Sequence, residues 1–161
     1  MIHSLKLQLR TPISAAHPYA LDFGAQSDEV DGRLADFHPK EPGSFRWSGP
    51  AAQVVVDRPL APGQDLKISV RALKSSPNPV FRQFLKVAVN RKDVGQTELL
   101  DRWDQFRTYD FPIPPGVPRS PQTVIVMTVS PPWTPTRSDT YTDDWRKLGC
   151  AVDWLKITAM K

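Results

Sequence analysis

The residues best suited to recognising a ligand are concentrated in one segment, 130–146. A sugar ring stacks its carbon face on an aromatic side chain, and its hydroxyls take paired hydrogen bonds from carboxylate and guanidinium groups. Sites of this kind combine an apolar surface with a few convergent polar groups. Connections this long are uncommon in compact domains and are usually functional or disordered. The segment therefore predicts a glycan-binding site built from Trp133, Arg137, Tyr141, Asp143, Asp144, Trp145 and Arg146.

Two other roles for this segment stay open. The aromatic side chains could cap one end of the fold, with Asp144 and Arg146 tying the segment down. The segment could also dock on another protein, because proline-stiffened loops lose little conformational entropy when they bind. A concave site with an exposed aromatic face would favour a glycan, and a flat apolar patch would favour a protein partner.

A second candidate segment is 36–43, which contains Phe37, His38 and Glu41 and precedes Arg46 and Trp47. Neighbouring residues of a regular strand point to opposite faces. We expect Trp47 in the core, with Arg46 paired to Glu41 or to a carboxylate of a loop. Trp103 and Trp154 border or lie in predicted strands, so we expect them in the core as well.

The sequence gives little support for catalysis. The histidines at positions 3, 17 and 38 share no metal-ligand spacing. The chain has no Gly-x-Ser-x-Gly elbow, phosphate loop or zinc signature. Cys150 lies in a predicted strand, where a cysteine behaves as a small apolar residue. We therefore predict a protein that is not an enzyme.

Alternating apolar and polar residues indicate the elements that position these segments. Residues 5–9, 66–71 and 85–89 alternate with a period of two, which is typical of half-buried antiparallel strands. Further strands are expected at 45–48 and 53–57, on either side of a turn at Gly49-Pro50, and at 94–99, 105–111, 123–129 and 148–158. In the last of these the apolar residues change parity, which predicts a β-bulge near Asp153-Trp154. Residues 90–93 read as a hairpin tip.

The composition agrees with this architecture. The 17 prolines among 161 residues disfavour long helices. We predict one all-β domain over residues 1–161, a two-sheet antiparallel β-sandwich.

The composition also excludes several classes of protein. The single cysteine excludes an intrachain disulfide. A net charge of +4, with basic residues scattered, argues against nucleic-acid binding. No apolar run is long enough for a membrane helix, so we expect no membrane insertion.

Four segments carry a family resemblance: Gly43–Gly49, Leu60–Gly63, Val87–Asn90 and Leu148–Ile157. With them the chain resembles galactose-binding-like jelly-roll domains, and more narrowly bacterial carbohydrate-binding-module-like domains. The resemblance implies two antiparallel sheets and non-catalytic binding by loops. Such domains are often attached to membrane glycosyltransferases or cell-surface proteins. The chain starts without a recognisable secretory signal, so an extracytoplasmic location is expected only if it is a domain excised from a cell-surface protein.

Some members of this superfamily hold a structural calcium ion beside the first and last strands. Calcium takes six to eight oxygen ligands, often carboxylates mixed with backbone carbonyls. The residues that could form such a site here are Asp22, Asp28, Asp31 and Asp153, with Glu29 nearby. Residues 28–32 do not match an EF-hand loop, and a solvated acidic turn is the alternative. No other cofactor is expected.

Overall fold

The structure is a computed structural model that describes residues 10–24, 33–41, 43–100, 102, 104–135 and 145–160. These residues contain nine β-strands: β1 (Tyr19–Asp22), β2 (Leu34–Phe37), β3 (Arg46–Val56), β4 (Leu66–Lys74), β5 (Phe84–Val89), β6 (Lys92–Glu98), β7 (Arg107–Ile113), β8 (Thr123–Ser130) and β9 (Cys150–Ala159). Within the described ranges no helix has the length and apolar character needed to cross a membrane.

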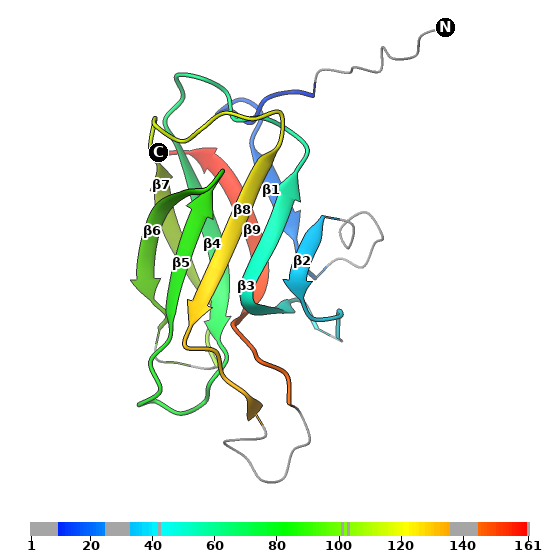
Figure 1. Cartoon of the computed structure of the whole chain (residues 1–161), viewed down its shortest axis with the longest axis vertical. Helices are drawn as coiled ribbons and strands as arrows, with labels where there is room; N and C mark the ends of the chain where they lie inside the picture. Colours follow the sequence, from blue (N-terminus) through cyan, green and yellow to red (C-terminus); the bar gives the residue numbers. More distant parts are fainter. Residues whose placement is uncertain are drawn as a thin grey trace, which may run out of the picture.

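The strands form two antiparallel layers, as Figure 1 shows. One layer has the order β7-β4-β9-β1, and the other has the order β6-β5-β8-β3-β2. The layers meet at β3, whose first residues pair with β9 and whose later residues pair with β8. The predicted all-β sandwich of two antiparallel sheets is therefore confirmed. The expected strand at 5–9 lies outside the described residues.

The expected turn at Gly49-Pro50 is wrong, because β3 runs through it as one strand of 11 residues. This is the point at which β3 leaves β9 and joins β8, so Pro50 is not required to donate a ladder hydrogen bond. Gly49 is needed there for another reason. A Cβ added at Gly49 would lie 2.5 Å or less from the carboxylate of Asp36, which accepts a hydrogen bond from Ala51 N.

The parity change in β9 is produced by the predicted bulge. Arg71 of β4 pairs with Trp154 while the next residue, Ala72, pairs with Val152, so Asp153 is the extra residue. Because of this shift, Val152 and Leu155 both face the interior. The prediction that Trp154 lies in the core is wrong. The bulge leaves its ring half-buried on the outer face of the sheet, with Lys156 Nζ 4.3 Å from the ring centre.

The hairpin between β5 and β6 is tighter than expected. Asn90 and Arg91 form the tip, both with positive φ, and the next two residues already belong to β6. The asparagine side chain fixes the tip: its Oδ1 accepts from Val124 N, and its Nδ2 donates to Pro118 O, both at 2.8 Å. Asparagine tolerates this backbone conformation better than most residues.

The antiparallel order places the connections at two ends of the sandwich (Figure 1). The lower end, as drawn, comprises the described parts of connections 38–45, 75–83, 99–106 and 131–149. The upper end comprises connections 57–65, 90–91 and 114–122. The described residues of both segments that the sequence singled out, 36–43 and 130–146, therefore lie at the lower end.

Candidate functional site

The connection between β8 and β9 begins and ends as a short two-stranded stem. Trp133 N donates to Leu148 O at 2.9 Å, and Leu148 N donates to Trp133 O at 2.8 Å. Leu148 is buried and Trp133 is half-buried. The part of the connection between them includes residues 136–144, which lie outside the described residues. The stem therefore fixes where this part of the connection leaves the sandwich and where it returns.

A buried glutamine, Gln83, contacts both arms of the stem where it joins the sandwich. Gln83 is 0% exposed, and its Oε1 accepts from the backbone N of Ser75 at 3.0 Å and of Ser76 at 3.3 Å. Its Nε2 lies 3.0 Å from Pro131 O and 3.5 Å from Gly149 O, one on each arm of the stem. A buried carboxamide whose oxygen and nitrogen are both bonded fixes the spacing of the chains around it.

The two segments singled out from the sequence meet beside this stem. Arg146 Nη1 forms an ion pair with Glu41 Oε2, and His38 Nε2 donates to Lys147 O at 3.1 Å. The Glu41 side chain is 44% exposed and the Arg146 side chain 31%, so the pair adds little to stability by itself. Its effect is to orient the chain on either side of Arg146.

The expected arrangement of Arg46 and Trp47 is reversed. Arg46 is only 5% exposed, because it is in register with the inward-facing Val152. Trp47 is half-buried on the outer face, where Phe45 packs edge-on against it with the ring centres 5.5 Å apart. Glu41, one of the expected partners of Arg46, pairs with Arg146 instead.

The predicted glycan-binding residues fall into three groups. Trp145 is 66% exposed and follows directly after the residues that the structure does not describe. Trp133 and Arg146 are half-buried, and both hold the connection in place. Arg137, Tyr141, Asp143 and Asp144 lie outside the described residues. Of the residues that can be placed, Trp145 alone presents a large apolar surface to solvent.

The proposed calcium ligands are only partly within the described residues. Asp22 Oδ1 accepts a hydrogen bond from Gly24 N at 2.8 Å, and Asp153 Oδ2 accepts one from Arg71 Nε at 3.1 Å. Asp28 and Asp31 lie outside the described residues. In the described part of the chain, no group of three or more His, Cys, Asp or Glu side chains could hold a metal ion. The calcium site stays a prediction, with Asp153 already bonded to a guanidinium.

Cys150 is buried at the start of β9, and its environment does not activate it as a nucleophile. Burial raises the pKa of its thiol to about 12, partly offset by the hydroxyl of Ser48. The same hydroxyl accepts a hydrogen bond from Cys150 N at 3.0 Å. Since the thiolate is the reactive form, this cysteine has a structural role at neutral pH.

Solved structures with a similar fold include two carbohydrate-binding modules. The C-terminal CBM6 of LamC, a marine laminarinase from Zobellia galactanivorans, is 10% identical with a TM-score of 0.51; the match covers 88% of this chain and 99% of that module. A family 35 carbohydrate-binding module from an environmental isolate is 12% identical with a TM-score of 0.50; the match covers 88% of this chain and 93% of that module. The chain thus has the jelly-roll fold of these modules, as the resemblance implied.

No protein-family model matches the chain, and no curated protein has a significant sequence match to it.

Proposed function

We propose that this protein is a non-catalytic glycan-binding module and that the connection between β8 and β9 forms its binding site. Two independent arguments support the proposal. The sequence of this connection contains the aromatic and hydrogen-bonding side chains that a sugar requires, and the fold is that of carbohydrate-binding modules. Fold alone does not establish function, so the proposal depends on the site.

The observation that carries the proposal is the exposure of Trp145 next to a rigid support. An indole that is 66% exposed offers a flat apolar face on which a sugar ring can stack. The residues after it are fixed: Arg146 by Glu41, Lys147 by His38, and Leu148 by Trp133. A ligand that stacks on the indole therefore finds its support already ordered, which lowers the entropic cost of binding.

The exposed indole is tested by Trp145→Ala in affinity gel electrophoresis. The full chain is run through gels containing laminarin, xylan, galactomannan or pectin. We expect at least one polysaccharide to retard the wild-type protein. Trp145→Ala should weaken that retention about tenfold or more, since an aromatic side chain at the centre of a contact contributes 1.4 kcal/mol or more.

The matched control is Val80→Ala, which removes another exposed apolar side chain at the lower end. Val80 is 80% exposed and lies in the β4–β5 connection, so its loss should leave retention unchanged. Both variants should change the free energy of unfolding by less than about 0.5 kcal/mol. If no polysaccharide retards the protein, or if Trp145→Ala is retained like the wild type, the proposal is wrong. A stable complex with another protein in the absence of glycan binding would favour the docking role instead.

A further inference from the structure

The central strand of the second layer carries apolar residues on both of its faces. In β8, Ile125, Met127 and Val129 point into the sandwich and are at most 1% exposed. Val124 and Val126 alternate with them and therefore point outward, where they are half-buried. The core between the two sheets makes no use of these two outward valines.

Small apolar side chains extend this outer face onto the neighbouring strands. Val55 of β3 pairs with Val124, and Ala88 of β5 pairs with Val126. Together with Ala51 of β3 these residues form what we call the valine face. Figure 1 views this sheet from outside, with β8 between β5 and β3, and no other described strand lies in front of them. Contiguous apolar surface of this kind marks a site of protein association.

Two charges of opposite sign lie at the same height on either side of the valine face. Lys86 of β5 pairs with Thr128 of β8, and Thr128 pairs with Ala51 of β3. Ala51 N in turn donates to Oδ2 of Asp36 at 2.9 Å. These residues form one row across four strands, with an ammonium group at one end and a carboxylate at the other.

Both end groups of this row lie on the outer side of the sheet. Lys86 stands between the buried Leu85 and Val87, so its side chain points outward. The carboxylate of Asp36 lies over the outer side of Gly49, because a Cβ added to that glycine would collide with Oδ1. Asp36 is exposed, and within the part of the chain that the structure describes it forms no ion pair.

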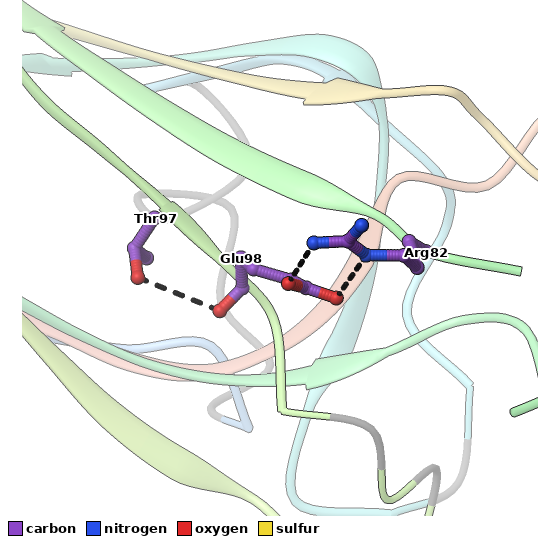
Figure 2. Close-up of polar contacts among 3 residues, drawn as sticks. All are labelled: Arg82, Thr97 and Glu98. Atoms are coloured by element: carbon purple, nitrogen blue, oxygen red, sulfur yellow. Dashed lines mark hydrogen bonds and ion pairs between the residues drawn. The ribbon is translucent and has the colours of Figure 1, made fainter. Parts of the chain in front are cut away.

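A neighbouring pair of charges is already matched within one chain. Figure 2 shows Arg82 Nε donating to Glu98 Oε2 at 2.8 Å and Arg82 Nη2 donating to Oε1 at 2.7 Å. This fork lies on the outer face of the β5–β6 hairpin. Lys86 approaches Asp93 at 3.6 Å, but both side chains are exposed and the ammonium group has three donors. Lys86 and Asp36 are therefore the charges that a partner can match.

We propose that the valine face is the contact between two copies of this chain, related by a two-fold axis that runs along β8. Such an axis lays β8 of one copy on β8 of the other and exchanges the two ends of the row. Lys86 of each copy then faces Asp36 of the other, so the contact is self-complementary, as a two-fold interface requires. Burial of the valines stabilises the dimer, and the two ion pairs fix its register.

The direction of this axis also determines where the two glycan sites lie. An axis parallel to the strands leaves the lower ends of both copies pointing the same way. The two Trp145 side chains are then on one side of the dimer, so one polysaccharide can engage both sites with greater avidity. This consequence rests on the proposed function, whereas the dimer itself does not.

The dimer is tested by light scattering and sedimentation of the full chain over a series of concentrations. The wild type should reach twice the 18.1 kDa of one chain. Val126→Lys places a charge at the centre of the valine face and should leave single chains. Lys86→Glu should weaken dimerisation by about tenfold or more, because like charges then face each other across the interface. Adding Asp36→Asn, which keeps an oxygen for Ala51 N, should recover part of that loss.

The matched controls lie on the outer face of the other sheet. Lys67→Glu changes a lysine that likewise lies near an aspartate, with Nζ 3.8 Å from Asp110 Oδ2. Thr158→Lys adds a charge at a half-buried position of β9. Neither should change dimerisation. A wild type that keeps the mass of one chain at every concentration overturns the proposal, and so does equal dimerisation by Lys86→Glu and the wild type.

Gel retardation of Val126→Lys separates the dimer from the proposed function. The comparison is with Thr158→Lys, which carries the same added charge. Weaker retention of Val126→Lys supports two sites on one side of the dimer. Equal retention of both variants, with a dimeric wild type, overturns that arrangement and leaves glycan binding intact. If the wild type is a dimer and no polysaccharide retards it, the dimer stands and the proposed function is wrong.

Discussion

Beneath the upper connections the space between the sheets is filled by aliphatic side chains, whereas near the lower connections amide, hydroxyl and ammonium groups are buried. Ile68, Ile125 and Ile157 represent the first region and are 0% exposed. Gln83 and Ser76 represent the second and are also 0% exposed. The same sandwich is therefore stabilised in two ways along its length.

The difference indicates what each region does. Apolar burial is strong and non-directional, so the upper region stabilises the fold without fixing one particular loop. A buried polar network is costly unless every group is bonded, and it then specifies one geometry. At the lower end, that geometry is the position of the stem formed by Trp133 and Leu148. We infer that the polar network exists to position the connection that carries Trp145.

The upper end also contains polar side chains, but they bind backbone groups close to the sheets. Arg58 donates to the carbonyls of Thr11 and His17, both at 2.7 Å, and so fixes the chain that leads into β1. Asn90 fixes the tip of the β5–β6 hairpin. Asn90 also holds the connection 114–122 through Pro118 O, and each residue is explained by the stability of the fold alone.

The largest effect is expected in the apolar region. Ile125→Ala should lower the free energy of unfolding by about 2–5 kcal/mol, because it removes a buried side chain and leaves a cavity. The folded fraction should still bind polysaccharide like the wild type, since no part of the loop site changes. Chemical denaturation and gel retardation together measure both quantities. Weaker glycan binding by the folded variant would contradict the separation of the two regions.

A smaller loss of stability but a clear loss of binding is expected from Gln83→Leu. This change keeps the approximate size of the side chain and leaves the buried N–H groups of Ser75 and Ser76 without their acceptor. The free energy of unfolding should fall by about 2–3 kcal/mol. Polysaccharide retention should weaken as well, because the stem loses its support. The control is Gln53→Leu, a half-buried position of β3 that holds no connection, which should change neither quantity appreciably.

The smallest effect is a pH dependence that comes from Cys150. The unfolded thiol has a pKa of about 8.5, and burial raises the pKa of the folded thiol to about 12. Above pH 8.5 the unfolded state therefore loses a proton that the folded state keeps, so stability decreases as the pH rises. The expected decrease between pH 8 and pH 10 is about 2 kcal/mol. Chemical denaturation of Cys150→Ala across this range should give a free energy of unfolding that decreases less steeply with pH, by the equivalent of about one proton. A decrease as steep as that of the wild type would contradict the raised pKa of the Cys150 thiol.

The strands could be predicted because each face of a half-buried strand repeats every two residues. This repeat predicts the strands at 66–71 and 85–89, and the broken alternation around Asp153 predicts the bulge. The inversion of Arg46 and Trp47 could not be predicted, because it depends on the pairing of β3 with β9. The strands β1 and β2 have only four residues each, too few for a clear period.

The candidate site was predictable in part, because some of its features are local in the sequence. Aromatic and charged residues are concentrated in a single connection, which is visible in the sequence. The support from Gln83 and the contact between Glu41 and Arg146 join residues 48 or more positions apart, so local patterns contain no sign of them.

The most direct test of the difference between the two ends is hydrogen–deuterium exchange of the full chain, with and without an oligosaccharide of the retained polysaccharide. The account predicts slower exchange at residues 38–41 and 145–149 when the oligosaccharide is bound, with no change in connections 57–65 and 114–122. Protection confined to the upper connections would contradict it.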